Sequence, residues 1–492
     1  MDPRTPVIVG VGQVNGENGA TEPLDLITIA AEGALGDCGQ TGVPIDLVAL
    51  SKIGTRQYAN APHQLAQRLG FPGARTMQAN HGGHTAQVIV AHAASEIAHG
   101  RSSAVLVAGG EHGSRLKKGG HVSDDGTPRG SASGTGGGDG PAAPDLAIGD
   151  DLTQWIAHPE EQRLGITEPI SMYPIMETAL GAALGRERGE HIREISALWA
   201  RFSEVASANE YADDRTVYTA DEIGTPASDN RYVGYPYTKR MNSNPFVDQA
   251  AAILLCSVGV AEGLGIPRDR WVFPQAAVTA HEPFVSERWS LHDSPALACA
   301  GRSLEVMVDR PLREFEIVDL YACFPFAVQV QANALGIAPG ADRTTTGGMS
   351  FAGGPWNNYA THMIANLVER VRERPEGMAV CSSNGGLATR FCLMAYSGAP
   401  SPGGFRSTPL PFADPGRRRH LETRPEGAGR VEGYTVLHDR ANQPTHAIAA
   451  CVLPNSARAW ARLNEPGDLA AMLAADPIGQ RVRFDGTHRL EG

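Results

Sequence analysis

The sequence lacks any segment long and apolar enough to cross a membrane, and it lacks a long run of Lys and Arg residues. Its longest apolar runs, such as Gln249–Val260, fall short of the roughly 20 residues that a spanning helix needs. The first residues, MDPRTPVIVGVGQ, do not contain a charged segment followed by a long apolar one, as a signal peptide would. The formal net charge of −12 at pH 7 disfavours binding to phosphates. We expect a cytoplasmic globular protein that binds neither membranes nor nucleic acid.

Cysteines are few for a chain of this length, and they are scattered. They form no C-x-x-C pair and show no histidine spacing typical of zinc sites, so we expect mostly reduced thiols and no metal. Three of them, Cys256, Cys392 and Cys451, lie inside apolar runs, where a small buried hydrophobic residue is the ordinary interpretation. The seven cysteines are Cys38, Cys256, Cys299, Cys323, Cys381, Cys392 and Cys451.

Two stretches of the chain alternate strand and helix patterns. In the first, the β-branched run Pro6–Gly12 precedes helical spacing over Leu24–Asp37, and the strand Thr76–Asn80 precedes an alanine-rich helix over Thr85–His99. Ser103–Glu111 then reads as a continuous apolar strand, which is typical of a sheet covered on both faces.

The second stretch repeats this alternation, and two halves of similar size predict a duplicated, doubly wound α/β unit. Strand signals resume at Ala250–Val260, before this stretch begins. The predicted strands of the second stretch are Trp271–Thr279, Glu316–Leu320, Met378–Cys381 and Phe391–Tyr396, and its predicted helices are Ser294–Val308, Phe326–Leu335 and Ala360–Arg374.

The region between these stretches has a different composition. Lys117–Pro144 is rich in Gly, Ser and Asp and has too little apolar content to fold alone, which predicts a mobile loop. Helical patterns over Ser171–Arg188 and Glu190–Tyr211 follow, and they predict a layer over one end of the first sheet.

The end of the chain predicts a separate β-rich module. Ala399–Pro415 has the Pro and Gly content of a linker, and the runs Val431–Leu437 and Thr445–Leu453 have the pattern of a hairpin. With 492 residues and 42% hydrophobic content, the chain is long enough for about two to four domains. We expect a first half at 1–265 with a loop domain at about 112–245, a second half at 266–405, and a small OB-like domain at 410–492.

Four motifs, three of which contain glycine, occur in an order that resembles the thiolase superfamily. They are Asn80–Gln87 with the following helix and Ala-Gly-Gly strand, Val318–Phe324, Gly347–Pro355 and Cys381–Gly386. Together with the β-rich tail, they resemble thiolase-like proteins of type 1, which are related to sterol-carrier thiolases. The resemblance covers about residues 5–400.

The resemblance implies a duplicated thiolase fold of five αβαβα layers. It also implies a coenzyme A thioester as substrate, no permanently bound cofactor, and an acyltransferase role in lipid metabolism, as in acetyl-CoA acetyltransferases. Thiolases pair one strand of each first half, so a homodimer is expected, and a monomer is the alternative.

The sequence departs from the family at the residues that carry its chemistry. The nucleophile position is Gly83, Tyr321 takes the place of an Asn or His, and Gly354 replaces a histidine. In the last motif, the second cysteine corresponds either to Cys381 or, by the better glycine register, to Ser383.

Four side chains are the candidate catalytic groups. His84 is either a general base or a structural residue at the start of a helix, and Tyr321 is either a hydroxyl donor or a half-buried aromatic. Cys323 and Cys381 follow predicted strands, where active sites of open α/β sheets collect, although ordinary packing explains both as well.

The remaining candidates bind the thioester or stabilise its oxyanion. Gly83 at the head of a helix offers free backbone N–H groups. Asn357 or Asn358 either caps the following helix or contacts the substrate. The other candidates are Gly354, His362, Asn384 and Gly385.

Three functions remain open. The first is a thiolase-like acyl-CoA enzyme that acts on a carbon–carbon bond beside the thioester without the usual cysteine. The second is a retro-aldol lyase on a β-hydroxyacyl-CoA, which needs a base and a stabilised enolate but no acyl-enzyme. The third is a non-catalytic acyl-CoA-binding protein.

Overall fold

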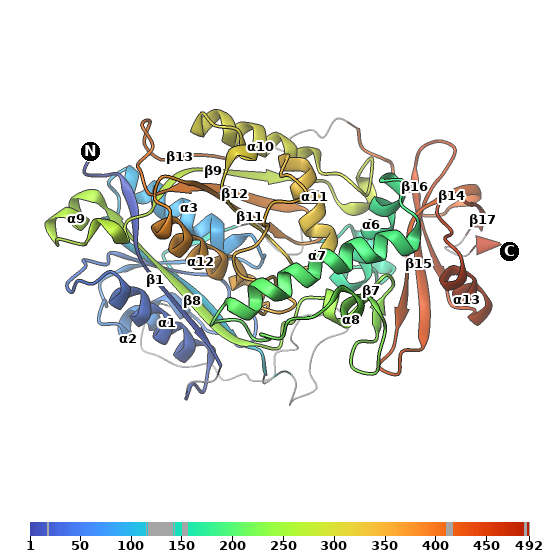
Figure 1. Cartoon of the computed structure of the whole chain (residues 1–492), viewed down its shortest axis with the longest axis horizontal. Coiled ribbons are helices and arrows are strands. Elements are labelled where there is room, and N and C mark those ends of the chain that lie inside the picture. Colours follow the sequence, from blue (N-terminus) through green and yellow to red (C-terminus); the bar gives the residue numbers. More distant parts are fainter. Residues whose placement is uncertain are drawn as a thin grey trace.

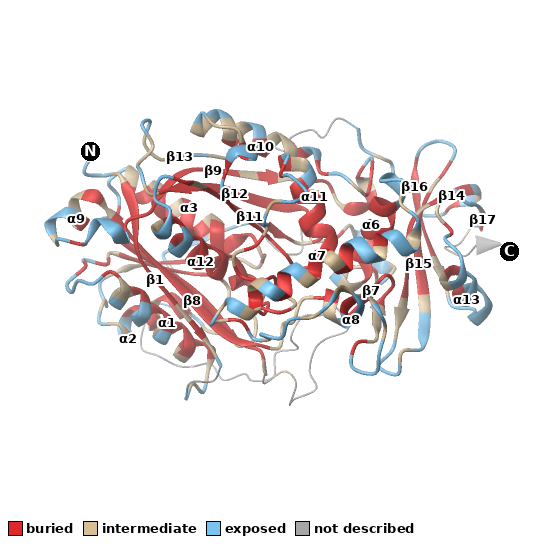
Figure 2. Ribbon diagram, viewed as in Figure 1, coloured by how far each residue is buried: buried red, intermediate tan, exposed pale blue. Residues whose placement is uncertain are grey.

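The computed structural model describes residues 1–16, 19–114, 116, 141, 143–149, 156–409, 417–486 and 490–491. Most of the predicted loop Lys117–Pro144 lies outside these residues. Figure 1 shows an elongated molecule in which two sheets with their helices fill one side and the C-terminal strands form the opposite end. Figure 2 shows that the strands of the two large sheets are almost entirely buried.

The first sheet has six strands in the order β1-β8-β4-β2-β3-β5. Helices α1 and α2 pack on one face, and α3 packs on the other, so alternate residues of β4 enter two different cores. This explains why the strand pattern is continuously apolar rather than alternating. The elements are β1 (Pro6–Asn15), α1 (Pro23–Asp37), β2 (Leu47–Leu50), α2 (Ala61–Arg68), β3 (Arg75–Ala79), α3 (Thr85–Ala98), β4 (Ala104–His112), β5 (Leu146–Ile148) and β8 (Asp248–Ser257).

The second sheet has five strands in the order β10-β11-β12-β9-β13. Helices α3 and α12 lie between the two sheets, as Figure 1 shows, and α10 and α11 cover the outer side. The predicted order of five layers, αβαβα, is therefore confirmed. The elements are β9 (Phe273–His281), α10 (Pro295–Val308), β10 (Ile317–Leu320), α11 (Pro325–Leu335), α12 (Tyr359–Glu373), β11 (Met378–Gly385), β12 (Arg390–Ser397) and β13 (Arg406–Pro409).

Two expectations about this half need correction. The predicted linker Ala399–Pro415 contains β13, which pairs in parallel with β9 and extends the sheet. The predicted strand Met378–Cys381 runs four residues further, to Gly385. The polar residues at the end of β11 stay in the sheet because they have hydrogen-bond partners. The Ser382 hydroxyl, for example, donates to Gln331 Oε1 at 2.7 Å.

Helices α6 (Pro169–Ala183) and α7 (Arg188–Ala208), in the region between the two halves, pack on α11, and α6 also packs on the C-terminal domain. Helix α6 ends before the predicted boundary because Gly185, with a φ of 67°, turns the chain into the left-handed region. The elements here are α5 (Pro159–Arg163), α6 (Pro169–Ala183), α7 (Arg188–Ala208), α8 (Ala220–Gly224), β6 (Tyr232–Gly234), β7 (Tyr237–Thr238) and the short helix η2 (Lys239–Met241). Further short helices are α9 (Val258–Gly263), η3 (Arg268–Arg270), η4 (Val285–Glu287), η5 (Leu312–Glu314) and η6 (Trp356–Asn358).

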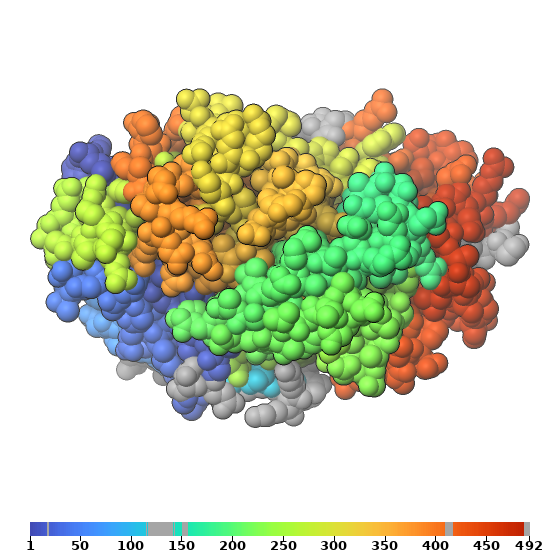
Figure 3. Space-filling view, in the orientation of Figure 1, coloured from blue at the N-terminus to red at the C-terminus, as the bar shows by residue number. Residues whose placement is uncertain are grey.

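The C-terminal domain contains the predicted hairpin. It is a sheet in the order β16-β15-β14-β17-β18, and its edge strands β16 and β18 lie near each other, as in a small barrel. Figure 3 shows this domain beside helices α6 and α7, and β14 packs on α6. The elements are β14 (Glu426–His438), β15 (Pro444–Val452), β16 (Arg458–Leu463), α13 (Pro466–Ala474), β17 (Arg481–Asp485) and β18 (Leu490–Glu491).

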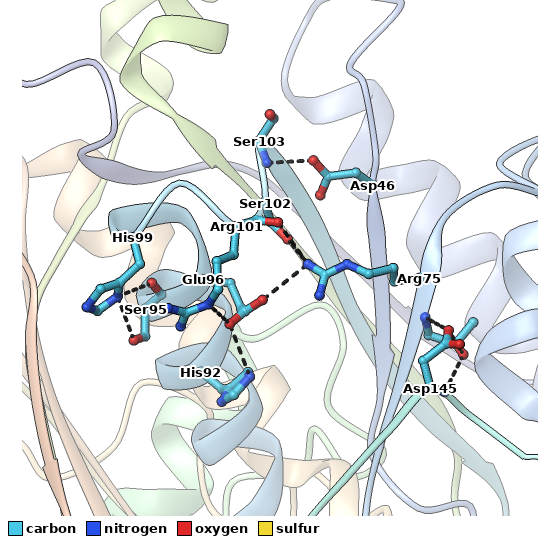
Figure 4. A network of polar contacts seen from close by, with 11 residues as sticks. Asp46, Arg75, His92, Ser95, Glu96, His99, Arg101, Ser102, Ser103 and Asp145 are labelled. Carbon is cyan, nitrogen blue, oxygen red and sulfur yellow. Dashed lines mark hydrogen bonds and ion pairs between the residues drawn. The ribbon is translucent and has the colours of Figure 1, made fainter.

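Strand β3 has neighbours on both sides, β2 and β5. Asp145, directly before β5, accepts hydrogen bonds at Oδ2 from the Thr76 N–H (2.7 Å) and hydroxyl (2.8 Å). Figure 4 shows Asp145 near Arg75, whose guanidinium bridges to Glu96 (3.1 Å) and Ser102 (2.7 Å). The Thr76–Asp145 hydrogen bonds fix β5 on the edge that β3 would otherwise present.

Candidate active site

The turn between β3 and α3 is held from both sides. The Gly82 N–H donates to Asn357 Oδ1 at 2.8 Å, and the Gly82 carbonyl accepts the Thr85 hydroxyl at 2.7 Å. Helix α3 begins at Thr85, so Gly83 lies at its head, as the sequence predicts. First-turn N–H groups of a helix lack intrahelical partners and carry the positive end of the helix dipole. The turn can therefore favour a negatively charged oxygen.

No side chain fits at residue 83. A Cβ added to Gly83 would lie 2.6 Å from the Asn384 carbonyl oxygen and 2.7 Å from Tyr321 Cζ, and closer still to the Tyr321 hydroxyl oxygen. Real Cβ atoms do not approach other heavy atoms this closely. The Tyr321 hydroxyl thus fills the space in which a nucleophilic side chain would begin.

Tyr321 follows β10, and hydrogen bonds of its backbone N–H and carbonyl fix its position. Its N–H donates to the Ser382 carbonyl at 2.9 Å, and its own carbonyl accepts Gln331 Nε2 at 2.9 Å. The ring is 4% exposed and packs edge-to-face on Tyr359, with the ring centroids 5.3 Å apart. Burial raises the pKa of Tyr321 well above its usual value, and Cys323 adds to the shift. The hydroxyl is therefore a proton donor at neutral pH.

His84 packs against the turn that follows β11. A Cβ added to Gly385 would lie 3.1 Å from His84 Cε1 and nearer still to Nδ1, so glycine at residue 385 makes room for the imidazole. His84 is 9% exposed. The structure therefore brings His84 and Gly385 together, and Asn384 lies between this contact and Gly83.

Cys323 lies in the same group, with a partner that the sequence reasoning missed. Burial raises the pKa of the Cys323 thiol to about 12, although hydrogen bonds from Tyr173 and Asn384 oppose the shift. The Tyr173 hydroxyl donates to Asn384 Oδ1 at 3.3 Å, and its ring stacks on Phe324 with centroids 4.5 Å apart. Tyr173 comes from α6, about 150 residues away in the chain, so no motif around Cys323 could have indicated it.

Cys381 is not placed at a strand end. It lies inside β11, in register with Asp319 of β10 and Met394 of β12, and it is fully buried. Burial raises the pKa of its thiol well above the usual value, and Asp319 and Cys392 add to the shift. The alternative residue, Ser383, is also fully buried, and its hydroxyl donates to the Cys392 carbonyl at 3.3 Å. Neither side chain joins the group around Gly83.

Gly354 and Asn357 have structural partners. The Gly354 N–H donates to the Asn244 carbonyl at 2.9 Å, so it is not free for an oxyanion. Asn357 Nδ2 donates to the Lys52 carbonyl at 2.8 Å, and Oδ1 holds Gly82. Asn357 therefore positions the turn before α3.

Asn358 and His362 also differ from expectation. Asn358 is at the N-cap position of α12, but its side chain binds the Gly109 carbonyl and the Thr361 hydroxyl, both at 2.7 Å, instead of a helix N–H. His362 is 5% exposed, and its Nδ1 lies 2.8 Å from Gln13 Oε1 on β1. Burial lowers the pKa of His362 to about 3. It therefore belongs to a contact between α12 and β1 rather than to the group around Gly83.

The group brought together is Gly83, His84, Tyr173, Tyr321, Cys323, Asn384 and Gly385. Within the described ranges, no set of His, Cys, Asp and Glu side chains is arranged to hold a metal ion. None of the described helices is both long and apolar enough to cross a bilayer. The group can donate protons and stabilise an anionic oxygen, and it offers no low-pKa thiol.

Comparisons with known proteins agree with this architecture. Residues 413–487 match the family described as the thiolase-like protein type 1 additional C-terminal domain. A search of curated proteins returns no match. Among solved structures, a monomeric SCP2-thiolase-like protein type 1 from Mycobacterium smegmatis is 27% identical, with a TM-score of 0.81, covering 100% of this chain and 99% of that one.

More distant structures share the fold alone. An aldolase, Ltp2-ChsH2(DUF35), is 15% identical with a TM-score of 0.60, covering 80% of this chain and 98% of that one. Human mitochondrial 3-ketoacyl-CoA thiolase in complex with CoA is 17% identical with a TM-score of 0.55, covering 80% of this chain and 99% of that one.

The two halves of the chain have the thiolase fold. The additional C-terminal domain and the match over the whole chain are those of the thiolase-like proteins of type 1, and the predicted resemblance is confirmed.

Proposed function

We propose that this chain is an acyl-CoA enzyme that acts on a carbon–carbon bond beside a thioester without forming an acyl-enzyme at residue 83. One observation carries the proposal: the Tyr321 hydroxyl and the Asn384 carbonyl occupy the space that a nucleophilic side chain at Gly83 would need. The substrate is a coenzyme A thioester, and no permanently bound cofactor takes part.

The cysteines do not replace the missing nucleophile. Covalent acyl transfer needs a thiolate, which in active sites is produced by a lowered thiol pKa. Burial instead raises the pKa of Cys323 to about 12, and it also raises the pKa of Cys381 well above its usual value. A reaction through Cys323 would therefore proceed with very little thiolate at neutral pH.

A retro-aldol cleavage suits the residues that are present. His84 takes the proton of a β-hydroxyl group, and the Cα–Cβ bond breaks to give a carbonyl product. The electron pair of the broken bond forms a thioester enolate. The Tyr321 hydroxyl and the N-terminal N–H groups of α3 stabilise the enolate oxygen, and a proton returns to the α-carbon. The remaining thioester leaves as an acyl-CoA. The neighbour named as an aldolase shares the fold with this chain.

A non-catalytic acyl-CoA-binding protein is the second candidate. The observation in its favour is burial: His84, Cys323 and Tyr321 are only 9%, 7% and 4% exposed. Gly83, which adjoins Tyr321, is itself half-buried.

The experiment offers the protein a panel of β-hydroxyacyl-CoA and β-ketoacyl-CoA thioesters and follows free CoA and cleavage products by mass spectrometry. We expect cleavage of a β-hydroxyacyl-CoA and a loss of about 10²- to 10³-fold in kcat for Tyr321→Phe, which removes one donor to the enolate oxygen. Tyr211→Phe is the matched control. This tyrosine is half-buried just after α7, and the variant should retain full activity. Thioester binding without turnover would favour the binding protein instead.

A further inference from the structure

A buried arginine of the C-terminal domain reaches into the second half of the chain. Arg458, on β16, is fully buried. Its Nη1 donates to the backbone carbonyls of Val285 (2.9 Å), Ser286 (3.3 Å) and Arg288 (2.6 Å). Its Nη2 and Nε donate to Glu432 Oε2 at 2.6 and 3.1 Å. Buried charge is tolerated only where it is paired and hydrogen-bonded, so these contacts fix the segment 285–288 against β16.

Two further side chains, those of Trp460 and Glu161, form hydrogen bonds to the segment 285–288. Trp460 Nε1, also on β16, donates to the Ser286 hydroxyl at 2.8 Å, and the Ser286 N–H donates to Glu161 Oε1 at 2.7 Å. The short helix η4 is thus clamped between the C-terminal sheet and α5.

The clamped segment carries a second arginine that contacts the candidate site. Arg288 is 5% exposed, and its Nη2 donates to the carbonyls of Leu387 (2.9 Å) and Ala388 (2.6 Å). Ala388 has a φ of 54°, a left-handed conformation that is uncommon for a residue with a side chain and needs support from its surroundings. The turn closes with a hydrogen bond from the Thr389 N–H to the Gly385 carbonyl at 3.1 Å.

Helix α6 provides a parallel connection from the C-terminal domain to this turn. The Thr178 hydroxyl donates to the Tyr434 carbonyl and accepts the Tyr434 N–H, both at 2.9 Å. One and a half turns earlier on the same helix, the Tyr173 hydroxyl binds Asn384 Oδ1 at 3.3 Å and lies 3.4 Å from the Gly386 carbonyl. Both connections end on residues 384–389.

We propose that the C-terminal domain is a built-in part of the candidate site, in which Arg458 and Arg288 are positioning residues for the turn 384–389. The domain sets the place of Asn384 and Gly385 relative to Gly83 and His84, rather than serving as an independent module for recruiting partners. The inference rests on the proposed function only in treating this turn as part of a site for thioesters.

Hydrogen exchange of the full-length protein, resolved to peptides by mass spectrometry, tests this directly. In Arg458→Met, amides of residues 385–389 should exchange at least about tenfold faster, while those of β4 keep their protection. Arg440→Met makes the same substitution at an exposed position of the same domain and should leave both regions unchanged. Unchanged exchange of residues 385–389 in a folded Arg458→Met protein would overturn the proposal.

Conservative variants separate positioning from general stability. Arg458→Lys keeps the charge but loses the planar set of donors, so it should give an intermediate increase confined to the same turn. Arg288→Lys should act on the turn and leave η4 and β16 protected. If Arg458→Met does not fold, Arg458→Lys and Arg288→Lys test the proposal in its place. The proposal would be contradicted if hydrogen exchange in both variants changed uniformly across the protein. Because the readout needs no turnover, it stays valid even if no thioester is cleaved.

Discussion

The Tyr321 hydroxyl and the α-carbon of Gly83 adjoin so closely that residue 83 has no room for a side chain. The Asn384 carbonyl closes the same space from a second direction, with 2.6 Å to a Cβ built on Gly83. Since one obstacle is a ring fixed by its backbone and the other is backbone itself, neither can move aside cheaply.

Gly83→Ala should therefore destabilise the protein by about 1–3 kcal/mol, the usual cost of overpacking. Urea unfolding followed by circular dichroism measures this. Gly36→Ala is the matched control: Gly36 lies in α1 with open space around its α-carbon, so alanine there should be neutral or should stabilise by about 0.5–1 kcal/mol. Equal stability of Gly83→Ala and the wild type would show that Tyr321 does not fill this space.

Thiol reactivity should follow burial rather than position in the motifs. Cys299 is the one partly exposed cysteine, and the other six are buried. Treatment of the native protein with iodoacetamide near pH 7.5 should modify Cys299 first and leave Cys323 and Cys381 unmodified, because burial raises the pKa of both thiols. Peptide mass spectrometry gives the order of modification. Faster alkylation of Cys323 than of Cys299 would indicate an activated nucleophile and revive the covalent mechanism.

His362 should contribute to the loss of stability in acid. Burial lowers its pKa from 6.5 to about 3, so between these values the unfolded chain binds a proton that the folded protein does not. The contribution of His362 to the free energy of unfolding is fully present above pH 6.5 and decreases as the pH drops below it. Between pH 7 and pH 5, the wild type should lose about 2 kcal/mol more than His362→Gln, which has no such proton to bind. Parallel curves of unfolding free energy against pH for the two proteins would contradict this assignment.

The chain should be a monomer in solution. A dimer formed by pairing β3 of two first halves requires a free edge on β3, and β5 already occupies that edge, fixed by the Thr76–Asp145 contacts. Light scattering after size-exclusion chromatography should give the mass of one chain. Asp145→Ala, which loosens β5, should increase self-association, whereas Asp2→Ala at the exposed N-terminal segment should not. A stable wild-type dimer would refute the prediction.

The sequence predicts the strands and helices of both halves well because their apolar patterns are strong. It fails where polar residues are buried. Cys381 reads as the last residue of its strand because Ser382–Gly385 are polar or small, yet these residues continue β11 with partners such as Gln331. Asn358 has the expected position before α12, but its Oδ1, the atom that would accept a helix N–H, accepts the Thr361 hydroxyl instead.

The candidate site is predictable only in its local parts. Gly83 and Tyr321 follow from motifs, because each motif is a short strand-and-turn unit whose residues stay together. Tyr173, Arg288 and Arg458 lie in segments with no recognisable motif, and a lone arginine in a sequence ordinarily indicates a solvated surface. Their roles depend on how α6, η4 and β16 pack, which no local pattern encodes.

The most direct test of the central claim is the intact mass of the protein during turnover of a β-hydroxyacyl-CoA or β-ketoacyl-CoA thioester, sampled by rapid acid quench. We predict that cleavage products accumulate while the protein keeps its unmodified mass, because residue 83 has no nucleophile and no room for one. A transient increase in mass equal to one acyl group, mapped to any cysteine, would contradict the proposed mechanism.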